Sequence, residues 1–464
     1  MPRLLITACV ALLLACQPES GPRSLEEQVA DLQEQAFRDD TAWRLLASLT
    51  KDIGPRMAGS EADARAVEWA ASRMRELGFD RVWLEQVDFP LWLRNSESGR
   101  VLGGASYELD LTALGGTPGT DGALQGEVVH FYSLAELEAA EAGSLAGKIA
   151  FVSAGMRRSR GAEEYSETVP QRSLGPFVAA EKGAAALLIR SVGTDTENSA
   201  PHTGIVSSSR TGQALPAAAL SNASADRLLA LLSEGPAVTV ELELDVGFRG
   251  QGRSHNVIGE FDGCGDGDEF ILIGGHLDSW DLGTGAHDDG AGVAITMAAA
   301  GIAARQKHRP RRGVRVVLFA NEEQGVYGGK AYAAAHADEL SRHVLGSESD
   351  LGAGRIFEFS TRVNEAAEPE IARLAALLEP LGITRAMDAP ASGGADIGQM
   401  RELGLPVIDL RHDASLYFDL HHTRNDTLDT VDPADLQFNV AAYVTLLQWA
   451  AASDVAFGPI EPSE

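Results

Sequence analysis

Residues 270–292 carry an imidazole and several carboxylates directly after a short apolar run. Residues 270–273 predict a buried strand, because two glycines end the run before a helical period can develop. The loop that follows presents His276, Asp278, Asp288 and Asp289. Open α/β sheets bind their ligands at the carboxyl ends of their strands. This pattern is typical of a metal site.

Three further clusters of candidate ligands follow other apolar runs. Glu322 and Glu323 are adjacent, and two neighbouring carboxylates repel each other unless a cation compensates or one of them is protonated. The third cluster contains Asp350, and the fourth contains His421 and His422 before a threonine. A surface Glu pair or a lone His is usually structural, so the hypothesis depends on the clusters occurring together.

Together the clusters offer two imidazoles and at least three carboxylates, without a thiolate. Mixed nitrogen and oxygen ligands suit zinc, with Mn²⁺ or Co²⁺ as alternatives. Two ions about 3.5–4 Å apart can share a carboxylate, lower the pKa of a water molecule and polarise a carbonyl. The clusters therefore predict metal-assisted hydrolysis.

The segments that must position these residues alternate between strands and helices. Residues 41–78 predict two helices and residues 81–90 a strand. Further strands are expected at 270–273, 314–320, 344–346 and 406–410, and helices at 291–304, 329–336, 368–381 and 436–451. This alternation predicts an α/β fold, a doubly wound and mostly parallel sheet with helices on both faces.

Residues 101–248 have a different texture, with short β-type runs between clusters of Gly, Ser and Pro, and one Ala-rich helix at 176–183. We find no His and carboxylate pair in this segment. It predicts a smaller, β-rich α+β domain inserted into the first. A lid over the site and a passive spacer are both open interpretations.

The N-terminus predicts export. Residues 1–15 form a signal peptide with a short apolar core, too short for a permanent transmembrane helix. The sequence LLAC resembles a bacterial lipobox, which makes Cys16 the expected lipidated first residue, although an ordinary cleaved signal is the alternative. Gln17 is not an acidic retention residue, so we expect attachment to the outer membrane, facing the periplasm.

The expected organisation is a signal peptide (1–15), a lipidated tether ending in a helix (16–40), a catalytic domain in two parts (41–100 and 249–455), the inserted domain (101–248) and a tail (456–464). If Cys9 leaves with the signal and Cys16 carries lipid, Cys264 is alone and no intrachain disulfide can form. The formal charge of −29 excludes a basic footprint for nucleic acid or anionic lipid. We expect membrane contact only through the lipid anchor.

Five motifs in order resemble those of the co-catalytic zinc exopeptidases: GGHLDSWD, GAHDDGAG, NEEQG, ESDLG and YFDLHHTRNDTLDTVDP. The similarity is to the carboxypeptidase Q branch of that family and covers roughly residues 43–451. It includes IGPRMAGS near the start and a protease-associated domain at about 101–248. The resemblance implies a zinc exopeptidase fold, two Zn²⁺ ions per chain and a peptide substrate; a homodimer is left open.

The resemblance also implies a ligand set. His276 and Asp350 would bind one zinc ion. Glu323 and His422 would bind the other, and Asp288 would bridge both.

Further roles come from the same resemblance. Glu322 would be the general base, and Asp278 would orient His276 as a supporting carboxylate. Asp289 would continue an unusual, cis-type peptide after Asp288. His421 is the less favoured ligand of the pair, because the family's ligand directly precedes the Thr or Ser.

The segment ASGGADI at 391–397 resembles the family's Gly-rich substrate loop. Its residues Ser392, Gly393 and Asp396 would hold a substrate terminus or carbonyl, and a structural turn is the alternative interpretation. The chain departs from the usual pattern at Asn321, where Ala is usual, and at His287, where Met is common. Neither departure removes a ligand.

The sequence therefore predicts a di-zinc exopeptidase that hydrolyses dipeptides or short peptides with free ends. An aminopeptidase on the same scaffold is the nearest alternative. Glutaminyl cyclisation is another, although related folds perform it with a single zinc ion. A non-catalytic, receptor-like relative is the alternative from a different class, but such relatives lose ligand residues that this chain keeps.

Overall fold

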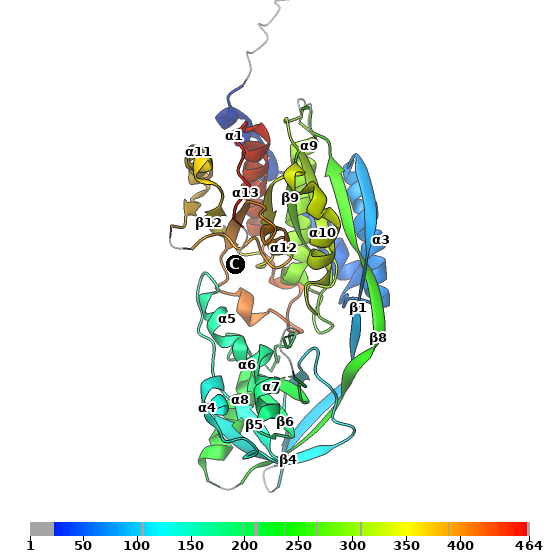
Figure 1. Ribbon diagram of the computed structural model, residues 1–464, viewed down its shortest axis with the longest axis vertical. Helices are drawn as coiled ribbons and strands as arrows, with labels where there is room; N and C mark the ends of the chain where they lie inside the picture. Colours follow the sequence, from blue (N-terminus) through cyan, green and yellow to red (C-terminus); the bar gives the residue numbers. More distant parts are fainter. Residues whose placement is uncertain are drawn as a thin grey trace, which may run out of the picture.

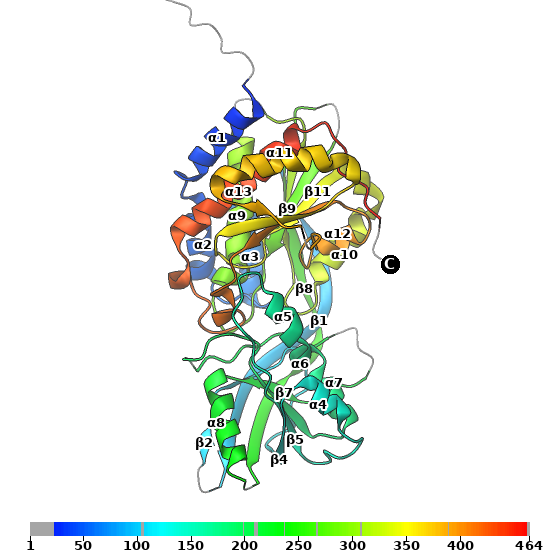
Figure 2. The ribbon, with the colours of Figure 1, turned by 90° about the vertical axis from the view of Figure 1, so that its left-hand side faces the viewer.

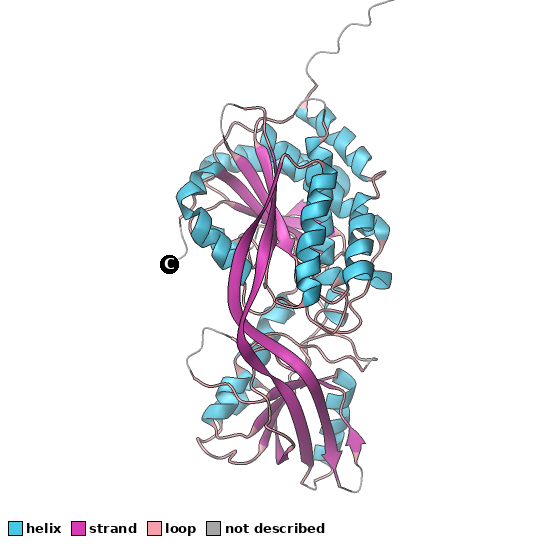
Figure 3. Cartoon of the chain, turned by 90° about the vertical axis from the view of Figure 1, so that its right-hand side faces the viewer, coloured by secondary structure: helices cyan, strands magenta, loops and turns pink. Residues whose placement is uncertain are grey.

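The computed structural model has two lobes along its long axis, and a long ribbon of two strands runs through both (Figures 1 and 3). It describes residues 23–461 apart from 104–105, 198, 208–211, 236, 266–267, 307–308 and 388. The predicted signal peptide and Cys16 lie outside these residues. Within the described part, no helix has the length and apolar character needed to cross a membrane.

The larger lobe is built on a mixed sheet with strand order β13-β12-β14-β11-β9-β10-β8. The bounds are β8 Thr239–Phe261, β9 Phe270–His276, β10 Gly313–Phe319, β11 His343–Glu348, β12 Ile356–Arg362, β13 Thr384–Arg385 and β14 Val407–His412. Strand β9 lies parallel to both β10 and β11, and β14 lies parallel to β11. Strand β8 pairs antiparallel with β10, and β12 pairs antiparallel with β14 and parallel with β13. The mostly parallel α/β sheet is confirmed.

Helices cover both faces of this sheet (Figure 2). On β9, Ile271 and Ile273 pack with one group of helices and Leu272 with the other, because successive side chains of a strand alternate. The first group is α1 Leu25–Ala36, α2 Thr41–Ser48, α3 Glu61–Leu77, α9 Ala291–Ala304, α11 Glu368–Leu378 and α13 Pro433–Ala452. The second is α10 Tyr327–His336 and α12 Gly398–Arg401.

Both ends of the described chain pack on the larger lobe. Helix α1, at the end of the expected tether, lies against α13 and buries Leu25, Val29 and Leu32. In the expected tail, the ring of Phe457 packs against Trp449 at 4.9 Å between centroids. The larger lobe thus includes residues on either side of the expected catalytic segments.

The smaller lobe continues the sheet from β8 in the order β4-β5-β6-β7-β3. Its strands are β2 Tyr107–Glu108, β3 Leu111–Ala113, β4 Leu124–Phe131, β5 Ile149–Val152, β6 Ala186–Arg190 and β7 Ala217–Leu220. Its helices are α4 Leu134–Ala139, α5 Glu163–Thr168, α6 Pro170–Ser173, α7 Gly175–Glu181 and α8 Asn222–Ser233. We call this lobe the inserted domain.

Strand β1 (Arg81–Leu102) pairs antiparallel with β8 along its whole length. The prediction that this strand ends at residue 90 is wrong. The pairing shifts register between Pro90 and Trp92 and again between Arg94 and Ser96, so the ribbon bends there and continues. Trp92 is already part of the core of the inserted domain. The two domains are therefore joined by a continuous ribbon.

Candidate metal centre

His276 is the last residue of β9 and is fully buried. Its Nε2 lies 3.1 Å from Oδ1 of Asp288 and 3.5 Å from Oδ1 of Asp350. Asp350 follows β11, the parallel neighbour of β9, so both side chains come from the carboxyl ends of adjacent strands. Asp288 comes from the segment before α9. These three residues form the first half of the site.

His422 forms the second half with Glu323, which follows β10. The Nε2 atom of His422 lies 2.9 Å from Oε2 of Glu323 and 3.2 Å from Oδ2 of Asp288. Asp288 therefore turns one oxygen toward each histidine. The structure brings together all five residues that the sequence predicts as metal ligands. The Nε2 atom of His421 is farther from Asp288, at 3.7 Å.

The centre fits a bound cation in its charge and in its unpaired atoms. In the described part of the chain, no Lys or Arg forms an ion pair with any of the five residues. Burial, followed by the charge of Asp288, raises the pKa of Glu323 to about 7. Oδ2 of Asp288 and Oε1 of Glu323 are buried without a hydrogen bond. Imidazole and carboxylate donors around unpaired oxygens suit a divalent ion such as zinc.

The backbone and side chain of Asp278 support the first half. Nδ1 of His276 lies 3.1 Å from the carbonyl oxygen of Asp278 and 3.7 Å from its carboxylate. The carboxylate instead accepts the N–H of Glu322 at 3.0 Å. Asp278 thus links the histidine to the segment that carries the expected general base.

The inserted domain supports the second half. Nδ1 of His422 lies 3.2 Å from the carbonyl oxygen of Thr203, and the N–H of Thr203 donates to the carbonyl of His422 at 3.1 Å. Nδ1 of His202 lies 2.6 Å from the carbonyl oxygen of His421. These contacts hold the segment that carries His422 from the side of the inserted domain.

His202 is itself part of a buried pair. Its Nε2 lies 2.6 Å from Oδ1 of Asp195. The expectation that residues 101–248 contain no His and carboxylate pair is therefore wrong. The two residues lie in a Gly- and Ser-containing loop that shows no periodic pattern, and the only signal is the dipeptide His202-Thr203 beside a proline.

Asp426 lies in the motif of the fourth cluster, but the sequence alone assigns it no role. Its carboxylate accepts three backbone N–H groups, from Ala286 at 3.0 Å, His287 at 2.7 Å and Asp288 at 3.1 Å. Burial raises the pKa of Asp426 to about 7. Asp426 therefore fixes the backbone that presents the shared ligand.

Arg56, in the IGPRMAGS segment, was missed in the same way. Its buried guanidinium donates to the carbonyl oxygens of Leu277 at 2.5 Å, Thr284 at 2.7 Å and Gly285 at 3.0 Å. A charged residue within an otherwise Gly-rich and apolar motif was the available signal. Arg56 ties the segments on either side of the centre together.

The backbone around Asp289 also serves the first half. The Asp288–Asp289 peptide is cis. The side chain of Asp289 accepts the N–H groups of His276 at 3.1 Å and of Gly292 at 3.0 Å. Asp289 therefore joins the end of β9 to the start of α9.

The predicted substrate loop divides into two parts. The N–H groups of Ser392 and Gly393 donate to Asp409 at 2.6 and 2.8 Å, as in a structural turn. Asp396 is buried; one oxygen accepts the N–H of Gly329 at 2.7 Å, and the other is unpaired. Burial, followed by the charge of Glu322, raises the pKa of Asp396 well above its usual range. Of the three residues, Asp396 is therefore the one whose pKa depends on a residue of the centre.

The two departures from the usual pattern are buried beside the site. Nδ1 of His287 accepts the N–H of Ala353 at 3.2 Å, and its Nε2 has no hydrogen-bond partner. Asn321 has a positive φ of 56°, and neither atom of its side-chain amide is hydrogen-bonded.

Comparison with known proteins gives a consistent result. The profile of peptidase family M28 matches residues 256–446. Carboxypeptidase Q of Xenopus laevis is 31% identical over 92% of this chain and 89% of its own length, and that of Homo sapiens is 32% identical over 89% and 84%. A solved Peptidase M28 precursor from Shewanella amazonensis SB2B is 44% identical, with a TM-score of 0.91 over 95% of this chain and 99% of its own. An aminopeptidase from Aneurinibacillus sp. strain AM-1 shares the fold, with a TM-score of 0.62, 22% identity and coverage of 93% and 98%.

Proposed function

The chain belongs to peptidase family M28 and is a zinc metallopeptidase, and we propose that it is a di-zinc exopeptidase acting on dipeptides or short peptides with free ends. The observation that carries the proposal is the position of Asp288. Its Oδ1 lies 3.1 Å from the ring of His276 and its Oδ2 lies 3.2 Å from the ring of His422. A carboxylate placed between two imidazoles in this way suits a bridging ligand.

Each half of the centre would hold one ion. His276 and Asp350 would bind the first, and His422 and Glu323 the second. Zinc bound there would polarise the scissile carbonyl and lower the pKa of a water molecule.

Glu322 is the residue of this chain that would move the proton. Its N–H is held by the carboxylate of Asp278 at 3.0 Å, which directs the segment beside the centre. Burial raises the pKa of Glu322 well above its usual range, and the nearby charge of Asp350 raises it further. A carboxylate with a raised pKa can take a proton from water and pass it to the leaving amine.

We infer that the enzyme releases the carboxy-terminal residue of its substrate, because the relatives that match most of the chain are named carboxypeptidase Q. An aminopeptidase remains the second candidate, because the shared fold serves aminopeptidases as well. A peptide with different residues at its two ends separates the two, since the first amino acid released identifies the end attacked.

The test of the mechanism is Glu322→Gln, which keeps the shape of the side chain and removes the base. We expect kcat for a free dipeptide to fall by a factor on the order of 100 to 10,000, with the zinc content unchanged. Full activity in this variant would show that Glu322 is not the base.

We also propose that the protein is exported as a lipoprotein through Cys16. This proposal depends on the LLAC sequence alone. Cys16→Ala should move the protein from the membrane fraction to the soluble fraction of the cells. An unchanged distribution would contradict lipid anchoring.

A further inference from the structure

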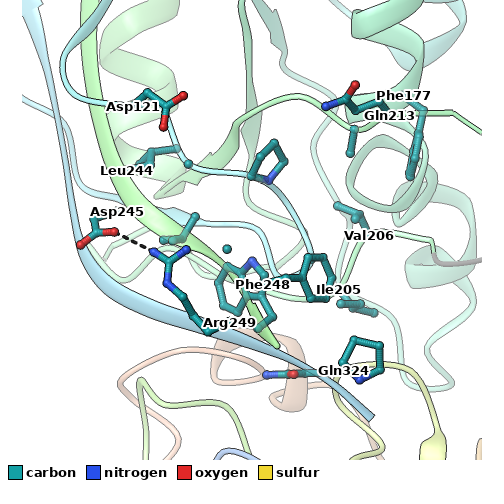
Figure 4. Close-up of a pocket in the computed structure, with 18 of the residues that line it drawn as sticks. Asp121, Phe177, Ile205, Val206, Gln213, Leu244, Asp245, Phe248, Arg249 and Gln324 are labelled. Carbon is teal, nitrogen blue, oxygen red and sulfur yellow. Dashed lines mark hydrogen bonds and ion pairs between the residues drawn. The ribbon is translucent and has the colours of Figure 1, made fainter. Parts of the chain in front are cut away.

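A cavity of about 1060 Å³ lies between the inserted domain and the larger lobe. Strands β1 and β8 form one wall, and the region of α7 forms the other (Figure 4). Its apolar lining includes Trp92, Phe177, Ile205, Val206 and Phe248. Ligand pockets for small molecules have volumes of about 300–1,000 Å³. The cavity is therefore larger than a dipeptide requires.

Gln324 is the residue of the cavity lining that lies nearest in sequence to a ligand of the metal centre. It directly follows Glu323 in the chain and lines the cavity from the larger lobe, together with Tyr327. Figure 4 shows Gln324 on the side that the larger lobe closes, below Phe248 and Ile205. Gln324 is 6% exposed, and neither its amide oxygen nor its amide nitrogen has a hydrogen-bond partner.

A buried amide without a partner is unfavourable, and most such groups in folded proteins are paired. An amide can both donate to a carbonyl and accept from an N–H, which are the two groups of a peptide backbone. The unpaired amide of Gln324 thus suits an extended peptide that enters the cavity beside the centre.

The charges of the lining indicate which end of a peptide would lie there. Among the described residues that line the cavity, the charged ones are Asp121, Glu243, Asp245 and Arg249. Arg249 is paired with Asp245 at 3.0 Å, which leaves the lining with an excess of two carboxylates. This excess would attract a free ammonium group and repel a free carboxylate.

We propose that this cavity binds the amino-terminal part of the substrate, so that the enzyme accepts apolar peptides of about three to five residues as well as dipeptides. The inference rests on the proposed exopeptidase function. Gln324 would hydrogen-bond the substrate backbone next to the scissile bond. Phe177, Val206 and Phe248 would contact its apolar side chains, and the ammonium end would lie near the carboxylates.

The experiment compares two substrates with the same scissile bond, Ala-Ala and Leu-Leu-Ala-Ala, and measures kcat/KM for release of the carboxy-terminal residue. The wild type should prefer the longer peptide. Phe248→Ala, which removes an apolar contact, and Gln324→Met, which keeps the length but removes the amide, should each lower the ratio of the two values about tenfold, mainly through KM. Acetylating the amino terminus of the longer peptide should also raise its KM.

Tyr132→Ala is the matched control. Tyr132 is an aromatic residue of the same domain, 71% exposed and outside the cavity lining, so its removal should leave the ratio unchanged. If Ala-Ala is hydrolysed and neither cavity variant alters the ratio, the inference is wrong and the proposed function stands. If the zinc-loaded wild type hydrolyses neither peptide from either end, both are wrong.

Discussion

The two histidines of the centre are supported by different domains. His276 ends a central strand, and its Nδ1 faces the carbonyl oxygen of Asp278, two residues further along the same domain, at 3.1 Å. His422 lies in a loop with a positive φ of 61°, and its Nδ1 faces the carbonyl oxygen of Thr203 in the inserted domain at 3.2 Å. The partner of the outer ring nitrogen selects which nitrogen is free for a metal. The inserted domain therefore supplies the backbone partner of the histidine in the second half.

Other contacts between the inserted domain and the larger lobe also lie near His422. The N–H of Thr194 donates to the carbonyl of Phe418 at 2.9 Å, ahead of the two histidines. Trp280, from the loop after β9, packs edge-on against Trp92 of the inserted domain with 6.2 Å between ring centroids. The same indole lies 5.8 Å from the ring of His422. These contacts favour a positioning role for the inserted domain over a passive spacer.

The largest expected effect, loss of one zinc ion and of hydrolysis, comes from removing the histidine of the second half. His422→Ala should lose the ion of the second half and keep the ion held by His276 and Asp350, with hydrolysis abolished. Elemental analysis of zinc per chain measures this outcome. Loss of both ions at once would contradict two separable halves.

A smaller effect should follow from a change in the inserted domain that touches no ligand side chain. His202→Ala removes the ring that contacts the carbonyl oxygen of His421 at 2.6 Å. We expect affinity for the second ion to fall about 10- to 100-fold, with the first ion unaffected. Chelator competition, which resolves the two removal steps, gives both affinities.

Two variants sharpen that test. His202→Asn keeps a donor for the carbonyl of His421 and should restore part of the affinity. His130→Ala changes a second histidine of the inserted domain, which is half-buried and contacts Ser153 and not the segment of His422, and should change neither step. Equal affinities in wild type and His202→Ala would show that the inserted domain does not position the ligand.

The smallest effect is expected at Asp426, which holds the backbone of the shared ligand Asp288. Asp426→Asn removes one of the two oxygens that accept the N–H groups of residues 286–288. Because Asp288 serves both halves, affinity for both ions should fall together, each by about tenfold. The same chelator titration applies, and a change confined to one step would contradict the shared role.

The sequence was most informative where ligands directly follow strands. His276, Glu323 and Asp350 come after apolar runs, and parallel strands bring their carboxyl ends to one edge of the sheet. Those runs correctly predicted β9, β10 and β11. The assignment of individual ions to these residues stays a prediction.

The parts that the sequence did not predict depend on contacts between distant segments. The contact from His202 to the carbonyl of His421 spans 219 positions, and a backbone carbonyl carries no residue-type signal. Strand β1 was shortened in the prediction because a proline, here Pro90, is typical of a strand end, whereas the pairing with β8 continues past it. Gln324 lies within a recognised motif, NEEQG, but only the folded structure shows that its amide is buried without a partner.

The most direct test of the account is the zinc content of the wild-type protein, purified without chelator, followed during stepwise removal by a chelator. The account predicts about two zinc ions per chain that leave in two separate steps, with loss of dipeptide hydrolysis and its return when zinc is added back. A single ion per chain, or none with hydrolysis intact, would contradict the di-zinc centre.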